Sequence, residues 1–279
     1  MVRTLTIILF SILLYKLSWA QDWKVLDQSE YIAEYAYIVQ EDSANADKTR
    51  HYSMALYIGE KYSKFEHIGH YYRDSLKQAS RQSGNNEASS YDVFSKTSNK
   101  PSSGLLNRYR IIKQTDNDSI LLTEGTINFT DRIKVEEIIK FDWHLVKSKI
   151  QTINGFVCHK ATTQFRGRNY TAWYTLEIPI SDGPYKFKGL PGLIVKIEDK
   201  QKQHMFELVK IERSNSFKKI YTKSENYQVV SMQNYHRYKK AENLKFIELF
   251  NNPEKFKTTG NIGEITAKMS RINNFIERF

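Results

Sequence analysis

Two histidines three residues apart are the first side chains in this sequence that could do chemistry. His67 and His70 follow Glu66 in the stretch FEHIGHYYRDSLKQAS, where apolar residues recur at near-helical spacing. On a helix, residues three apart share a face, so the two imidazoles together could bind a metal ion. The zinc-binding helix of metalloproteases instead places its histidines four residues apart. We therefore interpret His67 and His70 as a surface pair, and we expect no metal site.

The adjacent Cys158 and His159 are the second candidates, because a thiol beside an imidazole can act as a nucleophile. Neighbouring residues of a strand point to opposite faces, so a dyad would need another histidine brought in by the fold. We expect Cys158 to be buried and unreactive. The sequence has no phosphate-binding loop, dinucleotide glycine motif or serine elbow. It therefore assigns no catalytic residue and no cofactor.

The first twenty residues have the pattern of a secretory signal peptide. Arg3 precedes a short apolar run from Thr6 to Leu14, and two small residues, Ser18 and Ala20, stand before the expected cut. We expect residues 21–279 to be exported, to the periplasm or outside the cell. The alternative is an uncleaved membrane anchor, but the run is shorter than the ~20 residues that a spanning helix needs. No later stretch is long and apolar enough, so we expect no transmembrane segment after cleavage.

The charge and the cysteine content narrow the class of protein. Lysine and arginine number 42 against 31 acidic residues, which gives a formal net charge of +11. The basic residues are dispersed without a block of five, so we interpret them as a solvated surface and expect no nucleic-acid partner. The single cysteine excludes an intramolecular disulfide, so packing must supply the stability.

The elements that must position any site are mainly strands. Period-two alternation predicts strands over 30–39 and 53–59, a helix follows over 65–80, and short strands resume from 107. A polar, Ser- and Asn-rich stretch at about 81–104 predicts a long mobile loop.

Helical spacing returns in the region of about 227–279, with helices expected over 227–250 and 262–279. The fold class is therefore α+β, mainly antiparallel sheet, in a single domain from 21 to 279. One face of the first C-terminal helix would be lined by Leu244, Ile247 and Phe250.

The stretch GFVCHKATTQFRGRNYTAWYT predicts a β-hairpin. Gly167–Arg168 can form a two-residue type II′ loop, which would place Phe165 opposite Tyr170. Both faces of the hairpin carry aromatic residues, so either one could be the core face. One face would carry Trp173 and Cys158, and the other would carry Tyr174, Tyr170 and Phe165.

The stretch FKGLPGLIVKI, which follows the hairpin, combines a stiff turn with an apolar strand. Pro191–Gly192 is the signature of a type II turn, in which Gly192 has a positive φ and asparagine would be tolerated. Gly189 would allow a close approach of the backbone. We interpret this turn as structural. The alternative is a ligand or partner lip formed by Leu190, Pro191, Trp173 and Tyr174.

Residues Gly189–Ile194 spell GLPGLI, and the surrounding block Ile153–Asp199 resembles the GLPGLI family of exported proteins from Gram-negative bacteria. The resemblance implies a cell-envelope protein built as one GLPGLI-type domain with a largely antiparallel sheet. It also implies an open half-barrel that is similar to those of periplasmic lipoprotein carriers. No catalytic residue comes with the resemblance.

Two functions of different class remain open after these observations. The first is a non-enzymatic envelope protein whose half-open sheet binds an apolar, lipid-like or peptide-like ligand, or an outer-membrane protein. The alternative is a hydrolase of envelope or peptide substrates with an unrecognised site. Identifying the molecules that copurify with the protein would distinguish the two.

Overall fold

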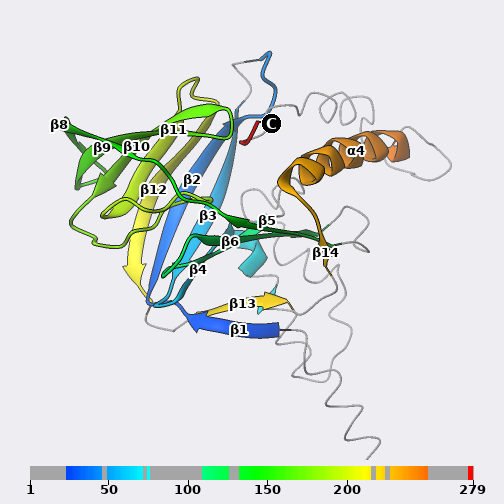
Figure 1. Ribbon diagram of the computed structural model, residues 1–279, viewed down its shortest axis with the longest axis horizontal. Helices are drawn as coiled ribbons and strands as arrows, with labels where there is room; N and C mark the ends of the chain where they lie inside the picture. The colour runs from blue at the N-terminus through cyan, green and yellow to red at the C-terminus, as the bar shows by residue number, and fades with distance from the viewer. Residues whose placement is uncertain are drawn as a thin grey trace, which may run out of the picture.

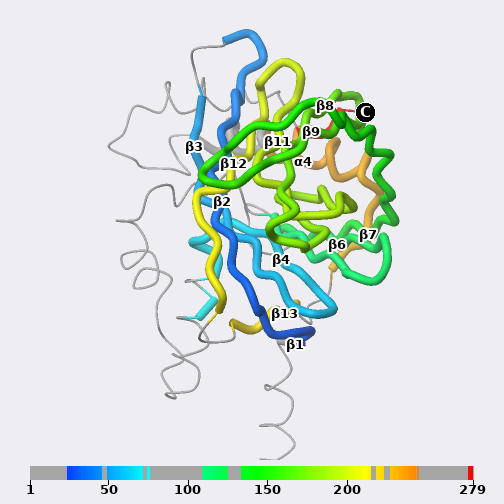
Figure 2. Tube along the Cα trace, turned by 90° about the vertical axis from the view of Figure 1, so that its left-hand side faces the viewer, coloured from blue at the N-terminus to red at the C-terminus, as the bar shows by residue number. Residues whose placement is uncertain are grey.

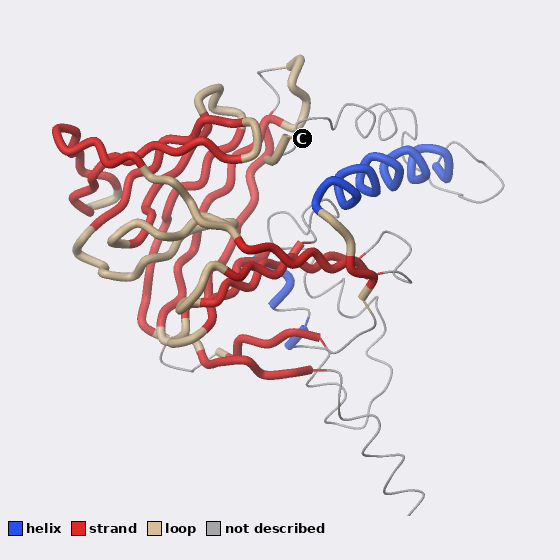
Figure 3. Tube along the Cα trace, in the orientation of Figure 1, coloured by secondary structure: helices blue, strands red, loops and turns tan. Residues whose placement is uncertain are grey.

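Strands dominate the structure, and the helix α4 (Met232–Phe250) extends away from them (Figure 3). The expected signal peptide, the expected loop at 81–104 and most of the expected helix at 262–279 lie outside the described residues. The computed structural model describes residues 23–45, 49–71, 74 and 75, 109–125, 132–214, 218–223, 227–250 and 276–278.

The described strands form two sheets, and the larger sheet has twelve strands in the order β14-β7-β6-β5-β4-β3-β2-β12-β11-β10-β9-β8. All neighbours are antiparallel except β14 and β7, which confirms a mainly antiparallel sheet. The strands are β1 (Trp23–Gln28), β2 (Tyr31–Gln40), β3 (Thr49–Ile58), β4 (Tyr62–His67), β5 (Tyr109–Gln114), β6 (Ser119–Gly125), β7 (Arg132–Ile138), β8 (His144–Ile153), β9 (Phe156–Phe165), β10 (Arg168–Thr175), β11 (Leu193–Asp199), β12 (His204–Arg213), β13 (Lys219–Lys223) and β14 (Gln228–Val229).

The large sheet is curved and, within the described part of the chain, remains open. β7 and β8 are consecutive in the chain, yet β7 is second and β8 is last in the sheet order. Residues 139–143 connect them, and the chain from Ile138 to His144 spans at most about 22 Å. The two ends of the sheet must therefore turn toward one another. In Figure 2 β7 lies on the right-hand side, and the β8–β9 hairpin crosses from that side toward β2, β3 and β12 on the left.

Alternation along the strands gives the large sheet two unlike faces. Its inner face, called here the core face, carries the main hydrophobic core, including Tyr35, Leu56, Phe65 and Ile111. The outer face carries a second buried cluster, in which Ile220 of β13 packs against residues of β2 and β3. The small sheet of β1 and β13, at the bottom of Figure 1, therefore covers part of the outer face.

The structure corrects the expected helix over 65–80. Phe65, Glu66 and His67 belong to β4, which pairs with β3 and β5, and helical backbone begins only at residue 68. The apolar residues of this stretch recur at helical spacing, but β3 and β5 hydrogen-bond to the backbone of residues 62–67 and hold it as a strand. The local sequence pattern does not reveal these two partners.

The C-terminal region is helical over a shorter range than expected. α4 confirms a helix within 227–250, whereas residues 276–278 are not helical. Leu244, expected on a packed face, is 62% exposed. The helix instead packs through Met232 and Tyr235 near its start, and both of these side chains belong to the main core.

The hairpin of β9 and β10 forms, but with a different turn. Phe165 pairs with Arg168, so the loop is Arg166–Gly167, and both loop residues have positive φ, 46° and 71°. This pattern is typical of a type I′ turn rather than the expected type II′ turn. The pairing is therefore displaced by two residues, and a displacement by two preserves the faces.

The faces of this hairpin are the ones expected from its sequence. Phe165, Tyr170 and Tyr174 lie on one side and all three belong to the main core. The rings of Phe165 and Tyr170 pack against that of the buried Phe187, so this side is the core face. Cys158 lies on the opposite side with Trp173.

The two glycines of GLPGLI have roles opposite to those expected. Gly189 has the positive φ, 95°, whereas Gly192 does not. The backbone at Gly192 lies against the backbone of Thr175, and a Cβ atom on Gly192 would lie 1.9 Å from the carbonyl oxygen of Thr175. This position therefore requires glycine. The expectation of a type II turn with a left-handed Gly192 is therefore wrong.

Candidate functional site

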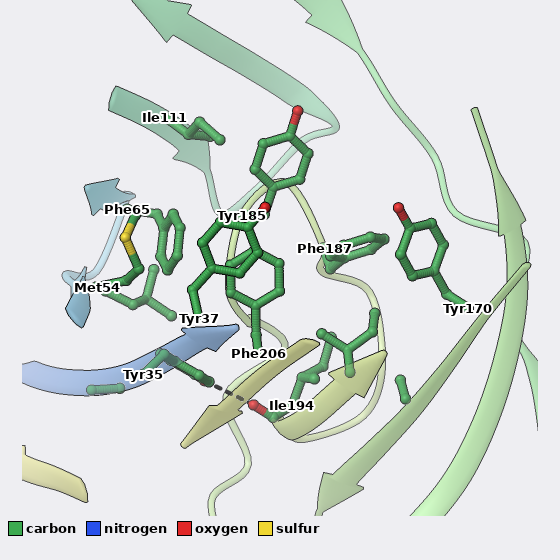
Figure 4. Close-up of a cluster of buried hydrophobic side chains, with 14 of the residues drawn as sticks. Tyr35, Tyr37, Met54, Phe65, Ile111, Tyr170, Tyr185, Phe187, Ile194 and Phe206 are labelled. Atoms are coloured by element: carbon green, nitrogen blue, oxygen red, sulfur yellow. Dashed lines mark hydrogen bonds between the residues drawn. The ribbon is translucent and has the colours of Figure 1, made fainter. Parts of the chain in front are cut away.

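Residues 178–192, called here the plug, fill space inside the curved sheet. Phe187 is fully buried, and its ring centroid lies 4.7 Å from that of Tyr170 and 5.3 Å from that of Phe141. Figure 4 shows Phe187 beside Tyr170, with Tyr185 nearby. The plug is thus an irregular connection between β10 and β11 whose aromatic side chains belong to the main core.

Buried lysines fix the plug to the opposite half of the sheet. Lys113 of β5 pairs with Asp182 of the plug and also donates to the carbonyl oxygen of Gly183. Burial lowers the pKa of Lys113, and the Asp182 carboxylate opposes that effect. A second contact has its lysine on the plug: Lys188 donates to the carbonyl oxygen of Gln114, the last residue of β5, at 2.6 Å. Charged groups inside a core are costly unless they are paired, so these contacts favour a single position of the plug.

The four residues predicted to form a ligand lip do not lie on one surface. Leu190 is buried in the core, and Tyr174 is buried with its ring centroid 5.7 Å from that of His159. Trp173 is partly buried on the other side of β10, and Pro191 is exposed. A ligand could therefore reach only two of the four, Pro191 and Trp173, without rearrangement of the core.

The edge strand β8 presents apolar side chains to solvent. β8 is the last strand of the large sheet, and nearly all of its residues are exposed. Leu145 pairs with Ala161, so it points to the core face, and Ile150 points the same way because it pairs with His159. These two side chains are nevertheless 49% and 57% exposed, and Val157 of β9 is also about half exposed. The core face therefore continues past the area that the plug covers.

A bulge interrupts β8 between its two exposed apolar residues. The pairing with β9 shifts after Val146, so residues 147–149 fall outside the paired register. The bulge holds two exposed lysines, Lys147 and Lys149. No acidic residue occurs in the sequence from 144 to 176, so β8, β9 and β10 themselves supply positive charge and no negative charge. The side chains of these three strands are therefore basic as well as apolar, and the nearest acidic groups come from outside them: Glu177 accepts a hydrogen bond of 2.7 Å from the amide of Val157, and Asp142 lies 4.0 Å from His144.

A cluster of buried charges lies on the outer face near β13. Glu66 pairs with Lys64 at 2.8 Å and with Arg110 at 3.0 Å. Arg110 also pairs with Asp74 at 2.9 Å, and the hydroxyl of Tyr221 donates to Asp74 at 3.1 Å. Burial lowers the pKa of Lys64, which the Glu66 carboxylate partly offsets. No sequence pattern indicates this cluster, because its members come from distant parts of the chain.

The two histidines are buried rather than at the surface, which corrects the expected surface pair. The ring centroids of His67 and His70 are 5.8 Å apart. The Nδ1 atom of His70 lies 3.9 Å from a carboxylate oxygen of Glu66. Among the residues that the structure describes, no group of three His, Cys, Asp or Glu side chains is arranged to hold a metal ion.

Cys158 is fully buried, as expected from the sequence. Burial raises the pKa of its thiol to about 11. The neighbouring His159 belongs to the opposite face, where its ring lies against Tyr174. A buried thiol with a raised pKa is a poor nucleophile at neutral pH, because the thiolate is the reactive form.

Comparisons with known proteins find one family model and weak similarities to solved structures. A family model described as "Protein of unknown function (Porph_ging)" matches residues 159–196, which run from β9 through β10 and the plug into β11. No curated protein matches the chain. Among solved structures, "Structure of PNGF-II in C2 space group" has a TM-score of 0.46 and 12% identity, and the match covers 75% of this chain and 32% of that chain. "Structure of PNGF-II in P21 space group" has a TM-score of 0.45 and 11% identity, with coverages of 76% and 33%.

This chain therefore spans about a third of the length of those two solved chains. No helix in the described residues is both long enough and apolar enough to cross a bilayer.

Proposed function

We propose that this protein is an exported, non-enzymatic binding protein that takes an extended peptide segment along the free edge of β8. The observation that supports this most directly is an edge strand that is exposed along its length and yet directs Leu145 and Ile150 to the core face. The peptide belongs either to a free ligand or to an outer-membrane protein of the cell envelope.

A terminal strand suits this task because one side of its backbone offers N–H and C=O groups for pairing. In the described part of the chain, no strand lies beyond β8. An extended peptide can pair with those groups and continue the sheet. Apolar side chains of the peptide would cover Leu145, Ile150 and Val157. Each of these is about half exposed, so covering it contributes on the order of 1 kcal/mol.

The lysines of the bulge favour one kind of peptide. Lys147 and Lys149 repel a second copy of β8 and disfavour a basic segment. They attract carboxylates, so the preferred peptide is acidic and carries apolar residues at alternate positions. This arrangement differs from a carrier that holds lipid inside its half-barrel, because here the plug contributes its own side chains to the core.

Export is the part of the proposal that rests on the sequence. The signal-peptide pattern of residues 1–20 and the resemblance of Ile153–Asp199 to GLPGLI proteins of the Gram-negative envelope both support it. N-terminal sequencing of the protein from its native host should give Gln21. An intact Met1 in the membrane fraction would contradict export with cleavage.

Site-specific photo-crosslinking in envelope extract tests the binding edge. A photoreactive residue replaces Ile150, and the control replaces Val209, which is also well exposed but lies in the central strand β12. Mass spectrometry should identify peptides captured at position 150 and not at position 209. The double substitution Lys147→Glu and Lys149→Glu should reduce the capture of acidic peptides several-fold.

Three outcomes would count against the proposal. Equal capture at the two positions would show that capture depends on exposure alone and not on the sheet edge. No capture at position 150 would remove the edge as a binding site. Cleavage of a captured peptide by the purified protein would support the hydrolase alternative instead.

A further inference from the structure

Two cations and a tyrosine converge where the plug meets the β9–β10 turn and β7, and this group is called here the Lys186 site. Lys186 of the plug is fully buried, and its Nζ lies 2.5 Å from a carboxylate oxygen of Glu137 of β7. Arg166 of the turn reaches the other carboxylate oxygen of Glu137 at 2.7 Å. Tyr185, also of the plug, completes the group. Glu137 therefore holds both cations from one side.

Residues 276–278 of the same chain occupy the Lys186 site. Glu277 is 2% exposed, and one of its carboxylate oxygens lies 2.7 Å from Nζ of Lys186. The same oxygen accepts a hydrogen bond of 2.6 Å from the hydroxyl of Tyr185. The second oxygen lies 3.8 Å from Nε of Arg166. Three side chains from two segments thus surround this carboxylate.

The main chain on both sides of Glu277 is also bound. The hydroxyl of Tyr170 donates to the carbonyl oxygen of Ile276 at 2.7 Å, and the amide of Arg278 donates to the carbonyl oxygen of Arg166 at 2.9 Å. These two contacts are to backbone atoms, so they would form with any residue that has a backbone amide there. The site thus binds a carboxylate side chain together with the peptide backbone that carries it.

The electrostatics of the site favour a carboxylate from a separate segment. The single carboxylate of Glu137 contacts both Lys186 and Arg166, so its one negative charge cannot neutralise the two positive charges. A buried cation is costly unless it is paired, so a second carboxylate beside Lys186 is strongly favoured. Glu137 does not belong to the occupant, so its contacts with both cations do not depend on the occupant, and we expect the site to be largely formed for another one.

The internal occupant does not use the whole site. The second carboxylate oxygen of Glu277 is buried and, among the residues that the structure describes, makes no hydrogen bond. Its 3.8 Å separation from Arg166 is longer than a hydrogen bond. A peptide that brings its carboxylate closer to Arg166 would shorten this ion pair and can therefore compete.

We propose that the Lys186 site binds glutamate-bearing peptide segments, and that residues 276–278 are an internal occupant that such a peptide can displace. The ligand class is an extended peptide with one carboxylate side chain, bound by Lys186, Arg166 and Tyr185 and by backbone contacts on either side. The site uses no residue of β8, so it does not depend on the addition of a strand there.

The test variant is the full chain with Glu277→Ala. The control variant is Glu136→Ala, which removes the exposed carboxylate next to Glu137 in the chain. The probe is a fluorescent peptide with the sequence of residues 273–279, NNFIERF, and the control peptide has Gln in place of Glu. The Glu peptide should bind Glu277→Ala at least tenfold more tightly than it binds the wild type or the control variant. The Gln peptide should bind Glu277→Ala at least tenfold more weakly than the Glu peptide does. Adding Arg166→Gln should weaken binding of the Glu peptide several-fold.

A second measurement covers the case in which Glu277→Ala does not fold. Hydrogen exchange of the wild-type protein is followed at residues 276–278 with an excess of either peptide. The Glu peptide should increase exchange there, because it displaces the internal segment, and the Gln peptide should not. Equal effects of the two peptides, or no binding and no change in exchange, would overturn the proposal and leave Glu277 as a purely structural ion pair.

Discussion

Single residues of the GLPGLI stretch show why local signatures can mislead. The Pro191–Gly192 pair predicts a type II turn, in which the amide of Leu193 would bond to the carbonyl oxygen of Leu190. That amide instead donates to the carbonyl oxygen of Ile178 at 3.0 Å. A partner at the far end of the plug therefore decides the conformation at Gly192, and no pattern of adjacent residues reveals that partner.

Substitutions at the two glycines should separate their roles. Gly192→Ala should destabilise the protein by about 3 kcal/mol or more, because its Cβ would meet the backbone of Thr175 and the two segments would have to move apart. Gly189→Ala should cost about 1–3 kcal/mol, since that site has a positive φ but the nearest atom to the added Cβ, on Trp143, is 3.7 Å away. Urea unfolding measures both. A smaller loss for Gly192→Ala than for Gly189→Ala would refute this assignment, and Gly192→Asn should be no milder than Gly192→Ala.

Cys158 gives a prediction for thiol chemistry. Because burial raises its pKa to about 11, a thiol reagent at pH 8 should label it slowly in the native protein and quickly in denaturant. The raised pKa also means that stability falls as pH rises from about 9 toward 11, because the unfolded chain releases the proton first. Cys158→Ser should remove this fall and cost little otherwise. Rapid labelling of the folded protein would restore Cys158 as a candidate nucleophile.

At the scale of single elements, alternation locates individual strands but does not indicate which strands become neighbours. The expected strand at 30–39 is β2, and the expected strand at 53–59 is the second half of β3. The β9–β10 hairpin has the expected faces but another turn, since Arg166–Gly167 and Gly167–Arg168 can each form a two-residue loop. The helix expected from residue 65 is absent there because β4 lies between two strands, and long-range pairing decides that position.

Strand β11 offers a test of its two faces. Val195 is fully buried, whereas Lys196 is partly exposed and pairs with Glu207 of β12 at 3.1 Å. Val195→Asp should cost about 3–5 kcal/mol, because it buries a charge among apolar side chains. Lys196→Asp should cost only about 1 kcal/mol, through the loss of the ion pair and the repulsion from Glu207. Thermal melts of the two variants compare them directly. Equal losses would mean that the outer side of β11 is also packed.

Helix α4 should make the stability of the protein depend on pH through His236. Burial lowers the pKa of this histidine to about 4, and the charges of Lys186, Lys240 and Arg166 act in the same direction, while Glu137 opposes them. The unfolded chain takes up a proton near pH 6.5, so this contribution to stability is complete above that pH and is lost as pH falls toward 4. Urea midpoints at pH 7, 5 and 4 should show this loss, and His236→Gln should reduce it. An unchanged pH profile in His236→Gln would exclude this histidine as the cause.

For the whole molecule, the candidate sites depend on contacts that the sequence does not reveal. Leu145 and Ile150 are exposed because β8 is at the end of the sheet. The alternation of residues within a strand does not indicate where that strand lies in the sheet, so the sequence could not predict this exposure. Likewise, Glu277 meets Tyr185 across 92 residues of chain. The antiparallel sheet was predictable because each strand carries its own pattern. The binding edge and the Lys186 site were not, because they form only when distant segments meet.

The order of strands in the large sheet has a consequence for how the polypeptide could be divided. β1 to β7 come from the first half of the chain and β8 to β14 from the second, and the two halves pair along β2 and β12, along β1 and β13 and, more briefly, where β14 meets β7. A break in residues 139–143 would therefore cut no strand. Two separately synthesised fragments, 21–140 and 141–279, should find each other through these pairings and through the buried pair of Lys113 with Asp182. The protein is therefore a candidate for fragment complementation, in which the folded protein forms only when both halves are present.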